Sequence, residues 1–397
     1  MANISMSVIG NLPPLLFIIF RETYGISYSL LGLLIVVAFS IQMVIDLVFS
    51  FFSHKFNITK TVKLIPVITI IGMLIYAAAP ILFPSNVYIG LVIGTLVFSS
   101  SGGLSEVLIS PVIAAIPAKD PDREMSKLHS IYAWGVVPVI LLSTLFLGIF
   151  GGKSWQILIL IFALVPLACA ILFAGAKIPE MKTPERASGA LMYLRDKGVW
   201  LCVVAIFLGG AAECTMAQWA SGYIESSLGL PKMIGDVCGA AMFGAMLGLG
   251  RTLYAKIGRN AEKVLLAGAV GASVCYLMAA LSPIPVIGLF ACAFTGLCVS
   301  MLWPGSLIVA SDRYPQSGVF IFAMMAAGGD TGASVAPQLV GIVTDLAIAS
   351  PKVVSLSESL GLPVEQLGMR FGMLVGSLFP IAAITVYIKL LKTRNRA

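Results

Sequence analysis

The chain has 397 residues, of which 59% are hydrophobic and only 11% are charged. Because a soluble domain carries about 25% charged residues, this composition excludes an ordinary soluble protein and indicates an all-α membrane protein. A membrane β-barrel is excluded as well, since its strands would alternate polar and apolar residues and these segments do not. The net charge of +7 does not indicate nucleic-acid binding, because Lys and Arg lie between the hydrophobic segments.

Twelve hydrophobic segments are long enough to cross a bilayer of about 30 Å as helices. The predicted spans of the first half are 3–20, 27–53, 62–83, 86–116, 129–151 and 154–176. The predicted spans of the second half are 198–226, 232–257, 261–281, 284–311, 316–348 and 367–391. The sequence therefore predicts twelve transmembrane helices.

A long polar connection after the sixth span separates the helices into two groups of six. We predict an N-terminal bundle over 1–176, a cytoplasmic linker over 177–197 and a C-terminal bundle over 198–397. The link after helix 2, "SHKFNITK", and the link after helix 8, "YAKIGRNAEK", are similar basic turns in which Lys55 aligns with Lys256. A turn repeated at equivalent places of two halves is typical of a duplicated transporter.

The distribution of Lys and Arg predicts the orientation, because cytoplasmic loops collect these residues. With a cytoplasmic N-terminus, the inside loops, helix ends and tail hold 19 Lys and Arg, whereas the outside loops and helix ends hold 5. We therefore predict a multi-pass protein of the cytoplasmic membrane with both termini in the cytoplasm. The first apolar segment lacks a preceding basic stretch, so we expect a retained span rather than a cleavable signal peptide.

No motif indicates an enzyme, a metal site or a cofactor. The seven cysteines all fall in apolar segments without a CxxC pair, and we interpret them as small apolar fillers. No Ser-His-Asp set, P-loop or His/Cys metal spacing is present, and the glycines of "GLGRTLYAKIG" follow no predicted strand. We expect no enzymatic activity, no cofactor, no metal and no nucleic-acid partner.

Glu106 stands in "SSSGGLSEVLISP", inside a hydrophobic run of about thirty residues. Ser99, Gly102, Gly103 and Ser110 share its helical face, and small residues either admit another helix or leave room for water. Because an acid within a membrane is costly and usually functional, we predict that Glu106 carries a proton on the substrate path and contacts substrate. The structural alternative is a glutamate bonded to a neighbouring helix.

Glu213 stands in predicted helix 7, with Gln218 and Trp219 within two turns of it. An acid, an amide and an indole suit a sugar, whose hydroxyls bond polar groups and whose CH face packs on a ring. We predict all three as substrate-binding and Glu213 as a proton-coupling residue as well. The structural alternative is a hydrogen bond between helices, with Trp219 at the lipid interface.

Four further side chains are candidates for the transport path. Asp330, in "AAGGDTGAS", is predicted as a proton-coupling acid, and His129 as a proton relay at neutral pH. Trp134 and Trp303 are predicted to form walls of the substrate site, and Pro304 is expected to loosen the helix beside Trp303. Structural hydrogen bonds and core packing are the alternatives for these residues.

A charged cluster is predicted near the cytoplasmic ends of helices 2 and 8. Its members are Asp46, Lys55, Arg251, Lys256 and Arg259. An acid against basic residues across the two halves is expected to hold the cytoplasmic side shut and to release when the halves rock. For the basic residues, the alternative is the positive-inside rule alone.

The twelve helices, the six-plus-six division and the basic turns resemble the major facilitator superfamily. The usual turn of that superfamily reads roughly G-x-x-x-D-R-x-G-R-R, and Lys256, Gly258 and Arg259 fit it well. "GGLSEVLISPVIAAIP" is similar to helix 4 of the fucose-permease-like branch, and "AAGGDTGASVAPQLVGIVTD" to its glycine-rich helix 11. That branch has a carboxylate in helix 1, whereas in this chain Asn11 is the only strongly polar side chain in the middle of helix 1. We include Asn11 among the substrate-binding candidates.

The resemblance implies a secondary transporter that moves a sugar or polyol with protons by alternating access of two bundles. Glu106 would be the lead proton site, and the partners would be the substrate, protons and the lipid bilayer, with the protein acting as a monomer. Two alternatives stay open. One is a proton-driven exporter of drugs or other organic solutes, and the other is a non-transporting membrane receptor or a channel.

Overall fold

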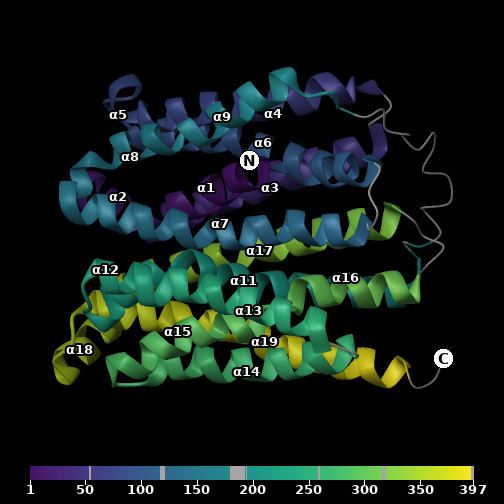
Figure 1. The fold of residues 1–397 in the computed structure, drawn as a ribbon. Helices are drawn as coiled ribbons and strands as arrows, with labels where there is room; N and C mark the ends of the chain where they lie inside the picture. The colour runs from purple at the N-terminus through teal and green to yellow at the C-terminus, as the bar shows by residue number, and fades with distance from the viewer. Residues whose placement is uncertain are drawn as a thin grey trace. The chain divides into compact units, whose positions relative to one another are not determined.

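The structure is a computed structural model that describes residues 1–52, 55–116, 121–178, 193, 195–257, 260–314 and 319–394. Every regular element within these residues is a helix. The prediction of an all-α protein is therefore confirmed, and Figure 1 shows the course of the chain.

Ten helical stretches of the described chain are long and apolar enough to cross a membrane. An eleventh is the pair of α1 (Ala2–Leu15) and α2 (Phe17–Tyr24), which is bent by 43°. The predicted fifth span corresponds to α7 (Pro121–Phe150), whose apolar part, Trp134–Phe150, is shorter than the others. Each predicted span thus corresponds to a helix or a broken helix, while length and hydropathy support ten to eleven crossings.

The chain divides into two compact units, and unit 1 comprises residues 1–19 and 37–188. Within it α4 packs on α6 and α9, and α1 packs on α7. Besides α1 and α7, unit 1 contains most of α3 (Tyr28–Phe52), α4 (Ile58–Ala77), α5 (Ala79–Leu82), α6 (Val87–Ala115), η2 (Gly152–Ser154), α8 (Trp155–Phe162) and α9 (Leu164–Gly175).

Unit 2 comprises residues 20–36 and 189–397. Its central helix is α11 (Lys197–Leu228), which packs against α15, α16, α17 and α19. The other elements are α12 (Lys232–Ile234), the π-helix η3 (Gly235–Ala241), α13 (Met242–Ile257), α14 (Ala261–Leu281), α15 (Pro285–Val299), α16 (Leu302–Arg313), α17 (Val319–Ala349), α18 (Pro351–Leu360) and α19 (Val364–Arg394).

Residues 20–36 lie in unit 2, although the sequence places them in the predicted N-terminal bundle. Their contacts give the physical reason. The carboxylate of Asp345 on α17 accepts the backbone N–H of Tyr28 at 3.2 Å and that of Ser29 at 2.7 Å. These first amides of α3 have no partner within their own helix, so Asp345 caps α3 from another helix.

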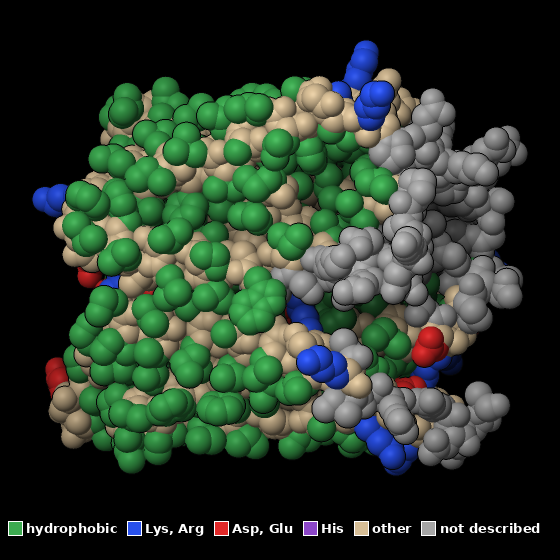
Figure 2. All heavy atoms as spheres, viewed as in Figure 1, with side chains coloured by type: hydrophobic (Ala, Val, Ile, Leu, Met, Phe, Trp, Pro, Cys, Tyr) green, Lys and Arg blue, Asp and Glu red, His purple; other side chains and the backbone are tan. Residues whose placement is uncertain are grey.

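The face seen in Figure 2 carries hydrophobic side chains along the helices, while Lys, Arg, Asp and Glu gather near the helix ends. This distribution matches a bilayer, because no water is available along the middle of a span to solvate a charge.

Two asparagines begin equivalent helices in the two units. Asn57 caps α4 by accepting the N–H of Lys60 at 3.0 Å, and Asn260 caps α14 by accepting the N–H of Lys263 at 3.0 Å. The capping asparagines therefore match Asn57 with Asn260, an offset of 203 residues, two more than the predicted match of Lys55 with Lys256.

We expect Asn57→Ala and Asn260→Ala each to lower the free energy of unfolding by about 1 kcal/mol, because each removes a side-chain cap. Thermal unfolding of the purified protein in detergent measures this loss. The matched control is Asn86→Ala, since Asn86 precedes α6 without a side-chain capping bond. An equal loss in all three variants would contradict the capping interpretation.

Candidate functional site

An ion pair joins two helices in the interior of unit 2. Nη2 of Arg251 on α13 donates to Oε1 of Glu213 on α11 at 2.9 Å. The side chains are 32% and 13% exposed, so the pair is largely shielded from solvent. Oε2 of Glu213 is buried and makes no hydrogen bond within the described part of the chain. The carboxylate therefore has one paired oxygen and one oxygen free to accept a further donor.

Arg251 makes a second hydrogen bond at a break between two helices. Its Nε donates to the carbonyl of Ser300 at 3.1 Å. Ser300 lies just after the end of α15, and α16 begins at Leu302. A cation at this position also interacts favourably with the carbonyl end of α15. The guanidinium is thus fixed by two acceptors on two different helices.

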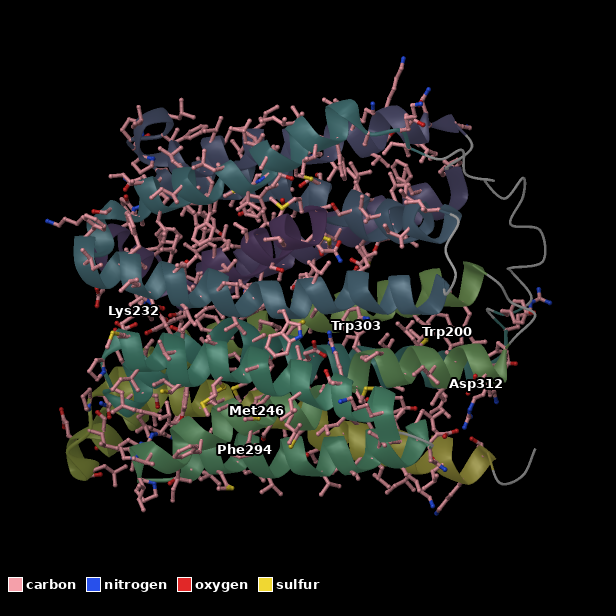
Figure 3. All side chains as sticks on the ribbon, in the orientation of Figure 1. Trp200, Lys232, Met246, Phe294, Trp303 and Asp312 are labelled. Atoms are coloured by element: carbon pink, nitrogen blue, oxygen red, sulfur yellow. The ribbon has the colours of Figure 1, made fainter. Side chains whose placement is uncertain are left out.

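The indole of Trp303 lies in a slot between α11 and α17. A Cβ placed on Gly329 would be 2.5 Å from Cη2 of the indole, and one on Gly210 would be 2.8 Å from its Cζ3. Only glycine leaves room for the ring at these two positions. Figure 3 shows Trp303 among the side chains of this unit. Asp330 follows Gly329 directly and is only 2% exposed.

These contacts bring four predicted residues of unit 2 into one region: Glu213, Arg251, Trp303 and Asp330. Gly210 lies one helical turn before Glu213 on α11, and Trp303 lies one turn after Ser300. The indole therefore occupies the layer next to the ion pair, toward the Lys197 end of α11.

Trp219 and Gln218 lie further along α11 and differ from each other in burial. Trp219 is 1% exposed, and its indole N–H donates to the carbonyl of Pro337 at 3.0 Å. Its ring also packs against Tyr28 with centroids 5.9 Å apart. Trp219 thus joins helices rather than presenting a free ring face, and we leave it out of the substrate site. Gln218 is half-buried, and no hydrogen bond to it is present among the described residues.

Glu106 is an exposed side chain of α6 in unit 1. Its predicted roles as a proton carrier and a substrate contact stay predictions. Gly103, one of the small residues before it, admits a neighbouring helix, which is one of the two roles predicted for them. A Cβ on Gly103 would lie 3.1 Å from the Cα of Gln42 on α3.

The other candidates of unit 1 are dispersed. The Asn11 amide donates to the Ser7 carbonyl of its own helix at 2.9 Å. Trp134 is 60% exposed on α7. His129 lies in α7, and its side chain falls outside the described residues.

The predicted cytoplasmic cluster is divided between the two units, with Asp46 and Lys55 in unit 1 and Arg251 and Lys256 in unit 2. Asp46 is 4% exposed in α3, whereas Lys55 and Lys256 are exposed. Arg251 pairs with Glu213 within unit 2. Arg259 lies outside the described residues. The gate role of all five residues stays a prediction.

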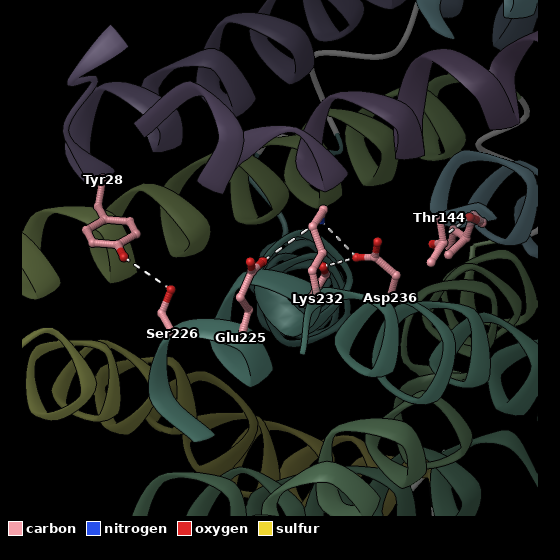
Figure 4. Close-up of polar contacts among 8 residues, drawn as sticks. Tyr28, Thr144, Glu225, Ser226, Lys232 and Asp236 are labelled. Carbon is pink, nitrogen blue, oxygen red and sulfur yellow. Dashed lines mark hydrogen bonds and ion pairs between the residues drawn. The ribbon is translucent and has the colours of Figure 1, made fainter. Parts of the chain in front are cut away.

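Sequence reasoning missed a second charged group of unit 2, shown in Figure 4. Nζ of Lys232 lies 3.1 Å from Oδ1 of Asp236 and 4.0 Å from Oε2 of Glu225. Asp236 is fully buried in the π-helix η3 and also accepts a hydrogen bond from Ser221. The spacing of Lys232 and Asp236, four residues apart, is the sequence signal that could have revealed the pair.

Among the described residues no group of three or more His, Cys, Asp or Glu side chains could hold a metal ion. All seven cysteines are free thiols.

Unit 2 thus places a shielded ion pair and an indole slot among apolar spans, an arrangement of a helical membrane protein. The chain belongs to the Major Facilitator Superfamily, whose sequence model matches residues 1–337. It is therefore a multi-pass membrane protein and a secondary transporter rather than an enzyme, and a small molecule is its substrate.

Solved structures with the same fold include three transporters. A bacterial homologue of the human lysosomal transporter Spinster aligns with a TM-score of 0.74 at 12% identity over 99% of this chain and 95% of its own. A D-xylose–proton symporter aligns with a TM-score of 0.74 at 15% identity, covering 97% and 95%. The fucose:proton symporter of E. coli aligns with a TM-score of 0.57 at 15% identity, covering 96% of each chain.

At these identities the likeness establishes the fold alone. Comparison with curated protein sequences gives no match. The fucose-permease-like branch therefore stays a prediction.

The glycine slot of Trp303 predicts a compensating pair of substitutions. Gly329→Ala places a methyl group against the indole and should lower the unfolding midpoint, at a cost of about 1–3 kcal/mol for overpacking. Adding Trp303→Phe removes the outer ring atoms and should recover much of that loss. Thermal unfolding of the single and double variants measures both effects.

Gly248→Ala is the matched control, because a Cβ on Gly248 of α13 meets no atom within 4 Å. It should leave stability unchanged or raise it, since alanine favours helices over glycine by about 1 kcal/mol. A double variant no more stable than Gly329→Ala alone would contradict the interpretation that Gly329 leaves room for the Trp303 ring.

Proposed function

We propose that the protein couples proton movement to the transport of a small hydroxylated solute, a sugar or a polyol, across the cytoplasmic membrane with both termini in the cytoplasm. The observation that carries this proposal is the Glu213–Arg251 pair with its free, buried Oε2. The proton symporters of D-xylose and fucose among the structural neighbours support the solute class.

A hydroxylated solute matches the groups around this pair. Its hydroxyl donates to the free oxygen of Glu213, and the remaining N–H groups of Arg251 donate to solute oxygens. The half-buried indole of Trp303 offers an apolar face to the CH groups of a sugar ring. Acid, guanidinium and indole together bind both the polar and the apolar side of such a molecule.

Proton coupling follows from competition for the Glu213 carboxylate. A proton on Glu213 removes the negative charge that attracts Arg251, whereas the charged form holds the guanidinium in place. Solute and proton thus both alter one ion pair, which links their binding energetically. Asp330, buried beside the Trp303 slot, is a further acid that can take part.

Glu106 is the proposed proton site of unit 1. A carboxylate exposed within an apolar span cannot face lipid at an acceptable cost, so it faces the water-filled solute path. Glu106 and Glu213 then supply one acid from each unit.

A second candidate function is the transport of a small organic acid. Arg251 favours it, because a guanidinium binds a carboxylate through two parallel hydrogen bonds. An acidic solute would replace Glu213 as the partner of Arg251.

Counterflow into proteoliposomes tests the proposal directly. Labelled D-xylose, D-glucose, D-mannitol and L-lactate are each offered to vesicles preloaded with the same unlabelled solute. Saturable counterflow of at least one hydroxylated solute, with accumulation driven by an inward proton gradient, is expected. Counterflow of lactate alone supports the organic-acid alternative, and passive flux without counterflow would indicate a channel and contradict the proposal.

Glu213→Gln should weaken binding of the transported solute by about tenfold or more, because a hydrogen bond to a charged group contributes about 1.5–3 kcal/mol. Equilibrium binding to the purified variant measures the loss. Glu365→Gln is the matched control, since Glu365 forms an exposed ion pair with Arg21 at 2.6 Å. Exposed pairs contribute about 0–1 kcal/mol, so this control should change affinity little. An unchanged affinity in Glu213→Gln would remove Glu213 from the site.

Glu106→Gln should abolish accumulation driven by a proton gradient while counterflow exchange continues, because glutamine cannot carry the coupled proton. Uptake with and without the gradient separates these two activities. Glu358→Gln, an exposed acid of the short helix α18, is the control and should accumulate solute normally. Accumulation that survives Glu106→Gln would show that another acid carries the proton.

A further inference from the structure

Ser300 has a backbone carbonyl whose usual helical partner is missing. In a continuous helix this carbonyl would accept the N–H of residue 304, four positions later. Residue 304 is proline, which has no N–H, and the helix is broken here between Val299 and Leu302. Among the described residues no backbone N–H donates to this carbonyl.

Arg251 takes the place of that missing donor. Its Nε lies 3.1 Å from the Ser300 oxygen while Nη2 holds Glu213 at 2.9 Å. The close approach of the helices depends on Gly250, because a Cβ there would overlap the Ser300 hydroxyl. Gly250 lets α13 lie against the break between α15 and α16. Arg251, the next residue, places its guanidinium between the Ser300 carbonyl and the Glu213 carboxylate.

We infer that Pro304 is a positioning residue for the substrate site, because it keeps the Ser300 carbonyl free to orient Arg251 toward Glu213. This inference rests on the proposed function for its effect on transport, whereas its structural part stands on the hydrogen bonds alone. Pro304 touches neither solute nor proton in this scheme. It acts through the carbonyl four residues before it.

The alternative explanation of Pro304 is a bend that serves packing only. Under that explanation, restoring an N–H at residue 304 would change stability but would have no specific link to Arg251. Under the positioning role, the restored N–H of Pro304→Ala competes for the Ser300 carbonyl. The guanidinium then loses one of its two acceptors and its fixed orientation.

The first test is a double-mutant cycle in thermal unfolding with Arg251→Met and Pro304→Ala. In the wild-type background Arg251→Met leaves both the Glu213 carboxylate and the Ser300 carbonyl unpaired. In the Pro304→Ala background the carbonyl has its own N–H. We expect a clearly smaller fall of the unfolding midpoint in that background, and equal falls would overturn the inference.

Pro380→Ala provides the matched background. Pro380 is likewise a proline inside a helix, α19, and lies away from the α15–α16 break in the sequence. Arg251→Met should lower the midpoint as much in this background as in the wild type. A reduced fall here would show that any proline replacement masks the Arg251 loss, which would also overturn the inference.

The second test separates positioning from packing through transport kinetics. For whichever of D-xylose, D-glucose, D-mannitol or L-lactate exchanges in counterflow, Pro304→Ala should raise the half-saturation concentration about tenfold, the effect of losing one fixed charged donor. The maximal rate should stay within about twofold, since the helices that move are unchanged. If the half-saturation concentration stays unchanged while the unfolding cycle is non-additive, Pro304 affects stability only. That result would contradict its role at the substrate site. If none of the four solutes exchanges, the proposed function fails, and the unfolding cycle still decides whether Pro304 orients Arg251.

Discussion

Unit 2 depends on one constraint: a guanidinium and a carboxylate that are shielded inside an apolar bundle must each be paired. Each charge would be costly alone, so each must have a partner with good geometry. Arg251 meets this requirement twice, through Glu213 and through the Ser300 carbonyl. These two bonds tie α13 to α11 and to the α15–α16 break.

Small residues make the surrounding contacts possible. Gly250 admits Ser300, and Gly210 and Gly329 admit the Trp303 ring. Membrane helices gain little from burying apolar surface against each other, because lipid is equally apolar, so close packing and hydrogen bonds must hold them together. In unit 1 the same rule explains Gly103, which admits the backbone of Gln42 and leaves Glu106 exposed. Packing glycines thus lie beside the acids in both units.

The helices and the residue types of the site could be predicted from sequence, and their pairing could not. Hydropathy located the spans, and an acid or indole within a span identified Glu213, Asp330 and Trp303 as candidates. The pairing of Arg251 with Glu213 was not predicted, because the distance of Arg251 along α13 from the basic turn says nothing about which helix its long side chain reaches. Asp345 and residues 20–36 are more than 300 residues apart, and only the three-dimensional structure shows the capping bonds between them.

The free oxygen of Glu213 gives the ion pair its proposed chemistry, and the paired oxygen gives it stability. The most direct measurement of their coupling is thermal unfolding of Glu213→Gln, Arg251→Met and the double variant. Each single substitution leaves a shielded group unpaired, at a cost below the roughly 3–5 kcal/mol of a fully buried pair because Arg251 is 32% exposed. A double variant whose loss of stability is clearly smaller than the sum of the two single losses is expected. A double variant whose loss equals the sum of the two single losses would contradict the coupled pair at the centre of unit 2.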